Sequence, residues 1–427
     1  MKILFITYMF PPSNAVGAVR TGKTAKYFIE SGHEVKVISC ANQTLVNSLP
    51  LEVSEKNIEY TPWLNVNSPI EMILGGKKKV ATKGYLQSSN HLPICIQKLG
   101  YLYRYLVNFP DGQIGWYPFA MKAGNNLIRR WSPDLIFASA SPYTALLVAS
   151  ALSQKYRIPW IAELRDLWCD NHNYLGPTWR QYLERKIESR ILKSACGLVT
   201  VSEPLKEVLD SKYSIPCKVI TNGFDPEDTP HSPVIPFLNG IVRIVYTGQI
   251  YSHEQDIFPL FMALQKMGKE REKIRIHFYG KHSGFTLPAI QPALELGFKH
   301  LIKFHQPVSH HDSLLLQADA DVLLLLPGVS PAWKGVYSAK LFEYLGAKRP
   351  VLCIGNREGV AAKLIRERRA GVTLNEPEQI ALQLQQWVKK KNDTREIPFL
   401  SDEVGKGFTR KELTEKLVEF FRVCLKK

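Results

Sequence analysis

Short apolar runs alternate with amphipathic helical segments along the whole chain, and this alternation limits the fold more than any other feature. The first run, residues 3–6, is continuous and uncharged, as in strands that are buried on both faces of a sheet. A helical pattern over about residues 19–31 follows, and residues 34–38 form the next strand. Two such strands joined through a helix make a right-handed crossover, so the sequence predicts a parallel sheet.

The alternation is interrupted once, by residues 221–240, a loop rich in Pro and Asp, and then resumes. Such a break is typical of a domain boundary. We therefore expect an α/β protein with two βαβ domains, residues 1–221 and residues 222–407. A final amphipathic helix, residues 408–427, is expected to pack back onto the N-terminal domain.

Composition excludes several other classes of protein. With 45% hydrophobic residues among 427, the chain is too apolar to be disordered. Seven scattered cysteines without a CxxC pair or zinc spacing predict reduced thiols in a cytosolic protein. The opening MKILFITYMFPP has too short an apolar run for a signal peptide. Residues 135–154 are uncharged and about long enough to span a bilayer, but four serines and Pro142 divide them into strand, turn and helix.

The charge balance favours anionic partners. The chain carries 55 basic and 39 acidic residues, a net charge of +16. Basic residues and aromatics are interleaved over residues 71–130, which favours an anionic membrane surface over nucleic acid, although a solvated face with buried aromatics is the alternative. The residues that we assign to an acceptor or membrane side are Arg20, Lys77, Lys78, Lys79, Arg104 and Trp116.

Two stretches of the N-terminal domain follow predicted strands and are candidates for chemistry. Gly17 lies at the start of the first helix, where free N–H groups and a close backbone approach suit a phosphate. It also fits a plain turn, and the spacing is not GxGxxG. Glu163, Arg165 and Asp166 follow a buried strand, so they face a ligand or form a structural ion pair. Arg165 suits a phosphate or carboxylate, and either acid could accept a proton.

The C-terminal domain has two matching stretches. Lys340 and Glu343 share one face at the start of a helix, where they suit a diphosphate and ribose hydroxyls, or else form an ordinary ion pair. Two strand ends contain glycine and could offer backbone N–H groups to a phosphate or base, although each also fits a tight turn. Their candidate residues are Gly248, Gln249, Tyr279 and Gly280. His253, His310 and His311 do not form a metal cluster and are expected at the surface.

Taken together, these segments resemble family 4 glycosyltransferases over nearly the whole chain. The motifs that carry the resemblance are MKILFITYMFPP…GAVRTGKTAKYFIESGHEVKVIS, PDLIFASASP, PWIAELRDLW, GLVTVSEPLKEVL, VITNGFD, IVYTGQI, ADADVLLLLPG and SAKLFEYLGAKRPVL. The branch that it is most similar to adds sugars in bacterial surface-polysaccharide assembly.

The resemblance implies a GT-B fold, in which two Rossmann-like domains face each other across a cleft. It implies retaining transfer of a hexosyl or N-acetylhexosaminyl group from a nucleotide-diphosphate donor, a UDP-sugar by expectation, to a lipid-linked or glycan acceptor. The donor lies mainly on the C-terminal domain of such enzymes. No metal or other cofactor is expected, because protein cations and helix N-termini hold the diphosphate. The expected location is the cytoplasm, at the inner face of the plasma membrane.

The resemblance also suggests roles for single residues. Gly17 falls in the glycine loop that approaches the donor phosphates, and Arg165 falls where many relatives have a histidine near the reacting sugar. Glu343 falls on the second glutamate of E-x7-E, which binds ribose, and Lys340 on the lysine of the S/P-x-K variant, a diphosphate partner. The first glutamate of E-x7-E is replaced by Gly335.

A second departure concerns phosphate charge. Residues 249–253 lack the basic pair of many relatives, so Lys340 is expected to carry more of that charge. The expected mechanism has Lys340 and amides near Gly17 and Gly248 hold the leaving diphosphate, while Arg165 and Asp166 guide the acceptor. Three rivals remain: a GT-B sugar-nucleotide epimerase, an NAD oxidoreductase disfavoured by the missing glycine fingerprint, and a non-catalytic sugar-nucleotide-binding protein.

Overall fold

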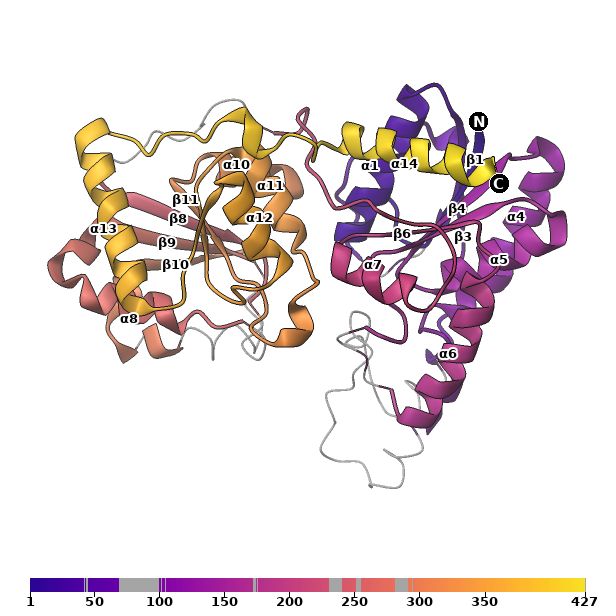
Figure 1. The fold of residues 1–427 in the computed structure, drawn as a ribbon, viewed down its shortest axis with the longest axis horizontal. Helices are drawn as coiled ribbons and strands as arrows, with labels where there is room; N and C mark the ends of the chain where they lie inside the picture. Colours follow the sequence, from indigo (N-terminus) through magenta and orange to yellow (C-terminus); the bar gives the residue numbers. More distant parts are fainter. Residues whose placement is uncertain are drawn as a thin grey trace. The chain divides into compact units, whose positions relative to one another are not determined.

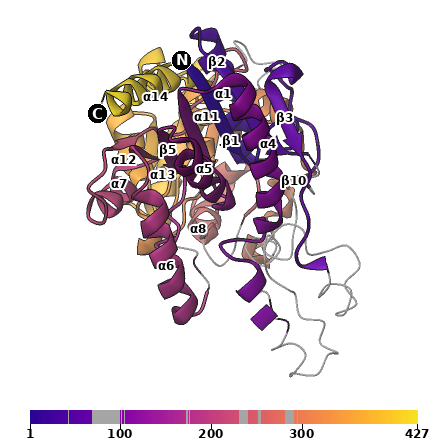
Figure 2. The same cartoon turned by 90° about the vertical axis from the view of Figure 1, so that its right-hand side faces the viewer.

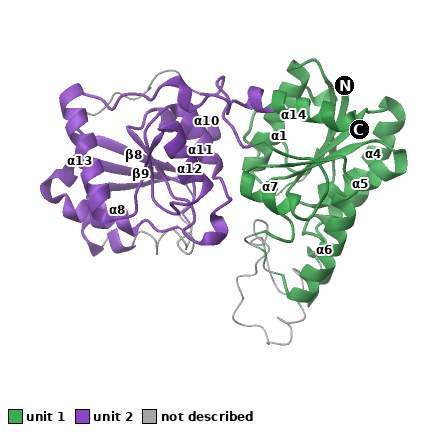
Figure 3. Ribbon diagram, in the orientation of Figure 1, with its two compact units in different colours: residues 1–220, 414–427 green, residues 221–413 purple. Residues whose placement is uncertain are grey.

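A computed structural model of the protein divides into two compact units, residues 1–220 with 414–427 (unit 1) and residues 221–413 (unit 2), which are described separately (Figures 1 and 3). The structure describes residues 1–41, 43, 45–68, 100, 102–103, 105–171, 174, 176–229, 240–250, 255–280, 291–293 and 295–426.

Unit 1 is built on a seven-stranded sheet in the order β3-β2-β1-β4-β5-β6-β7, and all of its neighbouring strands are parallel. The strands are β1 (Lys2–Thr7), β2 (Glu34–Cys40), β3 (Ile58–Thr61), β4 (Leu135–Ala140), β5 (Trp160–Leu164), β6 (Gly197–Thr200) and β7 (Cys217–Val219). The helices are α1 (Val16–Glu30), α4 (Tyr117–Trp131), α5 (Thr144–Tyr156), α6 (Thr178–Leu192), α7 (Glu203–Asp210) and the end of α14 (Arg410–Leu425).

Unit 2 repeats this plan with a six-stranded parallel sheet in the order β10-β9-β8-β11-β12-β13. The strands are β8 (Val242–Thr247), β9 (Ile274–Tyr279), β10 (Ile302–His305), β11 (Val322–Leu325), β12 (Val351–Cys353) and β13 (Gly371–Thr373). The helices are α8 (Phe258–Lys266), α10 (His310–Ala318), α11 (Ala339–Ala347), α12 (Val360–Arg368) and α13 (Pro377–Thr394). The predicted α/β fold with two Rossmann-like sheets is therefore confirmed.

The alternation of side chains along the strands separates two apolar layers in unit 1. Leu4 and Ile6 of β1 point into a core that α4 and α5 complete. Phe5, between them, points to the opposite face, where its ring centre lies 6.3 Å from that of Phe28 in α1. Because both faces are covered, the strands read as continuous apolar runs in the sequence.

The segment of residues 135–154 divides as predicted, into β4 and most of α5. Among the described residues, no helix combines the length and the apolar character that crossing a membrane requires.

The final helix, α14, completes the second layer of unit 1. The Phe421 ring is fully buried, with its centre 5.6 Å from that of Phe28 and 5.1 Å from that of Phe137 in β4. Residues 414–427 therefore belong to unit 1, although they follow unit 2 in the sequence. The chain passes from unit 1 to unit 2 after Ile220 and returns after Leu413.

Replacing Phe421 with Ala should destabilise unit 1 by about 3–5 kcal/mol, because it removes a ring that fills the layer between α1 and the sheet. The matched control is Val423→Ala in the same helix, since Val423 is 49% exposed and its loss should change stability by less than about 0.5 kcal/mol. Urea unfolding of both variants checks this expectation. Equal midpoints would contradict the packing role of α14.

Candidate functional site

Both sheets reverse their strand order beside their first strand, at β1/β4 in unit 1 and at β8/β11 in unit 2. In open parallel sheets, ligands bind outside the carboxyl ends of the strands at such a reversal. The side chains that follow these strands are therefore the candidate site residues of each unit.

In unit 2, the side chain of Lys340 lies directly over Gly248. Gly248 follows β8 with a φ of +124°, and a Cβ at this position would lie 2.6 Å from Cε and 2.8 Å from Nζ of Lys340. The ammonium of Lys340 lies 4.9 Å from the centre of the Tyr246 ring. Glycine is favoured here because residues with a side chain rarely adopt this φ.

Lys340 stands in the first turn of α11, where a positive charge is unfavourable. The free N–H groups of a helix N-terminus carry partial positive charge, which attracts anions and repels cations. No carboxylate of the described part of unit 2 lies within 4.0 Å of the Lys340 ammonium. The site thus concentrates positive charge at a strand end, and an anion would relieve that repulsion.

The two glycine amides that were candidates for a phosphate or base, or else for tight turns, are already bonded. The Gly248 N–H donates to the carbonyl oxygen of Tyr279 over 2.6 Å, and the Gly280 N–H donates to that of His305 over 3.3 Å. The expectation for these amides is wrong because the ends of neighbouring strands use them. Gly280 is needed for space instead, since a Cβ there would lie 2.3 Å from the Gly248 oxygen.

Glu343, one turn after Lys340, is a positioned carboxylate. Its Oε1 lies 3.2 Å from Nε2 of His310, and its Oε2 accepts a 3.0 Å hydrogen bond from Gln317. Burial alone would raise the pKa of Glu343, but these bonds and the charge of Lys340 lower it below its usual range. Glu343 is therefore an ionised acceptor, as binding ribose hydroxyls requires.

The sequence indicated Glu343 but missed the two residues that hold it. Both lie on α10, where His310 was expected to be a surface residue without a role. Gln317 is fully buried and also donates to the hydroxyl of Thr247 at the end of β8 over 3.2 Å. No local motif marks these residues, because α10 meets α11 only in the folded unit.

Tyr279 belongs to a stack of flat rings at the ends of β9 and β10. Its ring is nearly parallel to that of His305 at 4.2 Å, and the His277 ring lies 5.2 Å from that of His305. Burial, followed by the neighbouring His305, lowers the pKa of His277 to about 4, so this ring is neutral at physiological pH. The carbonyl of Gln249, in the adjacent loop, accepts a 3.0 Å hydrogen bond from Tyr246.

In unit 1, Gly17 and Arg165 meet at the β1/β4 reversal. A Cβ at Gly17 would lie 2.2 Å from a terminal nitrogen of Arg165, so only glycine leaves room for this guanidinium. Arg165 is fixed by donating to the carbonyls of Ala140 over 2.8 Å and Ser141 over 2.6 Å. The guanidinium therefore adds positive charge beside the first turn of α1, which carries no acidic residue.

Glu163 is buried in an ion pair beneath this surface. It accepts a 2.6 Å hydrogen bond from Arg20 and a 2.5 Å bond from the Ser139 hydroxyl, and Arg20 also donates to the carbonyl of Ile220 over 2.8 Å. Burial alone would raise the pKa of Glu163, but Arg20 and Ser139 hold it below its usual range. Glu163 is only 2% exposed, so in unit 1 it positions Arg20 and does not face an open surface. Asp166 is partly exposed.

Two residues assigned to the acceptor or membrane side are not at a surface. Trp116 is fully buried, donates to the Thr61 hydroxyl over 2.7 Å and packs edge-on against Tyr8. Arg20 is 3% exposed because Glu163 neutralises it inside unit 1. Their assignment to a membrane surface is therefore wrong. Lys77, Lys78, Lys79 and Arg104 lie outside the described residues.

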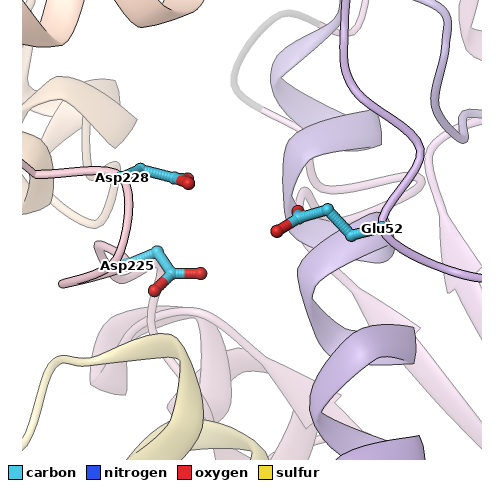
Figure 4. Close-up of side chains that lie close together, drawn as sticks. All are labelled: Glu52, Asp225 and Asp228. Atoms are coloured by element: carbon cyan, nitrogen blue, oxygen red, sulfur yellow. The ribbon is translucent and has the colours of Figure 1, made fainter.

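The carboxylates labelled in Figure 4 belong to different units. Asp225 and Asp228 lie on the first segment of unit 2, whereas Glu52 of unit 1 accepts bonds from Lys23 over 2.8 Å and Lys26 over 3.0 Å. Over its described residues, neither unit alone groups three side chains suited to a metal ion.

Comparison with known proteins shows which sequences and folds this chain is similar to. A sequence model described as Glycosyltransferase Family 4 matches residues 81–228. A search of curated proteins finds no match. The fold is that of GT-B glycosyltransferases.

Three solved structures illustrate the shared fold. HepE of Anabaena in complex with UDP is 15% identical with a TM-score of 0.64, covering 99% of this chain and 100% of that one. A glycosyltransferase of Rickettsia africae is 16% identical with a TM-score of 0.62, covering 100% and 99%. Sucrose-phosphate synthase of Thermosynechococcus elongatus is 12% identical with a TM-score of 0.63, covering 99% and 98%.

Two buried glutamates of unit 1 should give opposite pH dependences. The lowered pKa of Glu163 means that its stabilising effect is present above pH 5 and is lost as pH falls below about 4.3. Burial raises the pKa of Glu188 in α6, so its ionisation destabilises the folded state as pH rises. The stability lost in Glu163→Gln should therefore grow between pH 3.5 and 7, while that lost in Glu188→Gln should shrink.

Urea unfolding of both variants across this pH range measures the two trends. The wild type at each pH is the reference, so the titration of all other groups cancels. Trends of the same sign would contradict the charge states assigned to these carboxyl groups.

Proposed function

We propose that this protein is a retaining glycosyltransferase that moves a sugar from a UDP-sugar to a lipid-linked or glycan acceptor in cell-surface polysaccharide biosynthesis. The observation that carries the proposal is the Lys340 ammonium over Gly248 at the reversal of the unit 2 sheet. The Family 4 match supports the reaction class, and the complexes of HepE with UDP and UDP-glucose support the choice of donor.

The donor's diphosphate is assigned to Lys340 and the first turn of α11. Positive charge fixed in place before the reaction stabilises the leaving diphosphate without any reorganisation at the transition state. The bond between the anomeric carbon and the diphosphate oxygen then loosens toward an oxocarbenium-like state. The acceptor hydroxyl attacks from the same face, and its proton passes to the departing diphosphate. Gly248 contributes through its backbone conformation beside Lys340, and not through its amide, which donates to the Tyr279 carbonyl.

The ribose is assigned to Glu343. Hydrogen bonds from α10 keep this carboxylate ionised and oriented, so its remaining lone pairs can accept the ribose hydroxyls. In unit 1, Arg165 beside Gly17 is assigned to the acceptor side of the reaction, together with Asp166. Glu163 is a positioning residue, because its carboxylate binds Arg20. No metal or cofactor is part of the proposal.

Replacing Lys340 with Ala should lower sugar transfer by about 100-fold or more, since it removes the main charge that stabilises the leaving group. The matched control is Lys363→Ala on α12, because this lysine is well exposed and its partner Glu367 lies 3.8 Å away. UDP release from a panel of UDP-sugars measures both variants. Near-wild-type turnover of the Lys340 variant would remove the diphosphate assignment.

Replacing Glu343 with Gln should weaken UDP binding by about 10-fold or more, because hydrogen bonds to a charged group contribute about 1.5–3 kcal/mol. The lost affinity should depend on the 2′-hydroxyl of the ribose. The wild type should prefer UDP to 2′-deoxy-UDP, and the variant should bind the two with similar affinity. Calorimetric titration with both nucleotides gives the four dissociation constants. An unchanged preference in the variant would place the ribose elsewhere.

A further inference from the structure

Helix α6 of unit 1 buries Ile191 and Leu192 at its C-terminal end, but its first turns place charged side chains inward and large apolar side chains outward. Its buried face carries charged side chains, because Arg180, Glu184 and Glu188 are only 9%, 1% and 2% exposed. Its outer face begins with three large apolar or aromatic side chains. Trp179 is 45% exposed, Tyr182 60% and Leu183 45%.

The outer residues form one continuous stripe. Tyr182 and Leu183 lie three and four residues after Trp179, Lys186 lies four and three residues after them, and Arg190 follows Lys186 by four, so these residues share one side of the helix. We call this stripe the α6 face. Its N-terminal half is apolar and aromatic, and its C-terminal half is cationic. The Lys186 ammonium lies 4.4 Å from the centre of the Tyr182 ring.

Charged contacts on the inner side prevent α6 from rolling over to bury this stripe. Arg180 donates to Glu184 over 2.6 Å and to the carbonyls of Tyr105 and Pro110 over 3.2 Å. Glu188 accepts a 3.2 Å bond from the backbone N–H of Cys169. Turning the helix would break these buried bonds, and each buried charge left without a partner is costly.

The electrostatics of the α6 face are also one-sided. Both acidic residues of α6, Glu184 and Glu188, point inward, so the exposed charges of the helix are all positive. The helix lies on the outside of unit 1, where Figures 1 and 2 show it extending away from the sheet. The segment that Arg180 bonds exposes two more large apolar residues, since Leu102 is 49% and Leu106 61% exposed.

We propose that the α6 face is the surface through which unit 1 lies on an anionic lipid bilayer. Trp and Tyr favour the boundary between headgroups and acyl chains, Leu enters the apolar side, and Lys and Arg bind anionic headgroups. This assignment deepens the proposed function by naming the membrane surface for a lipid-linked acceptor. It centres on α6, outside the surface expected at residues 71–130, although Leu102 and Leu106 of that segment are exposed as well. It rests on exposed side chains with a matching charge.

Vesicle sedimentation tests the proposal on the full chain. The wild type should pellet with phosphatidylcholine vesicles that contain 30% phosphatidylglycerol, and less as salt is raised. The variant Trp179→Ser/Tyr182→Ser/Leu183→Ser should bind them at least 10-fold more weakly, as should Lys186→Gln/Arg190→Gln. The matched controls in unit 2 are Leu382→Ser, at a residue that is 60% exposed, and Lys363→Gln. Both should bind like the wild type.

The fluorescence of Trp179 reports contact with the bilayer, and a folding defect would not produce the same change. The emission of Trp179 should shift to shorter wavelength on binding, and Trp179→Phe should keep most of the binding but lose the shift. Unchanged sedimentation of the triple variant overturns the proposal, as does equal binding of the wild type to vesicles without phosphatidylglycerol. A wild-type dimer that becomes monomeric in the triple variant would also overturn the proposal, because a second copy of the chain would then cover the α6 face.

UDP binding separates this proposal from the proposed function. The α6 variants should bind UDP like the wild type, since α6 belongs to unit 1 and the nucleotide site to unit 2. Loss of vesicle binding with intact UDP binding supports the α6 face on its own. Normal vesicle binding by a protein that binds no UDP would reject the UDP-sugar donor and keep the membrane surface.

Discussion

The right-handed crossover between parallel strands is the constraint on which the candidate site depends. Because every strand of a sheet runs in the same direction, all the carboxyl ends open at one edge. In unit 2 this geometry brings together Gly248 after β8, Tyr279 at the end of β9 and Lys340 after β11. These residues are distant in sequence and have no common motif. The sheet alone makes them neighbours.

Charge placement distinguishes the parts of the protein that maintain structure from those suited to bind. Arg20 and Glu163 neutralise each other inside unit 1, and Lys391 and Asp321 do the same inside unit 2. Breaking either pair would leave a buried charge, so these groups belong to the scaffold. Lys340 differs, because its charge adds to the positive N-terminal end of α11. Its ammonium lies over the Tyr246 ring, near the carboxyl end of β8. Anion binding is the event that would neutralise it.

The same reasoning explains why α6 is unusual. A surface helix normally buries its apolar stripe, since removing apolar area from water contributes about 25 cal/mol per Å². Helix α6 buries Ile191 and Leu192, but the bonds of Arg180 and Glu188 hold its first turns with their large apolar side chains outward. Both helix faces satisfy the amphipathic period, so the sequence cannot tell which one turns inward. Only the partners on the neighbouring segments decide it.

The sequence by itself determined the fold class, because apolar residues alternate between the periods of strands and helices. Such an alternation buries the apolar sides of strands and helices together in a parallel sheet covered by helices. It also indicated Gly17, Arg165, Lys340 and Glu343, since these residues follow predicted strands directly. The tertiary structure decided what each polar group contacts. It buried Trp116 and paired Arg20 with Glu163, and it used the Gly248 amide within the sheet. It also brought His310 and Gln317 to Glu343, because hydrogen-bond partners depend on packing between elements far apart in the chain.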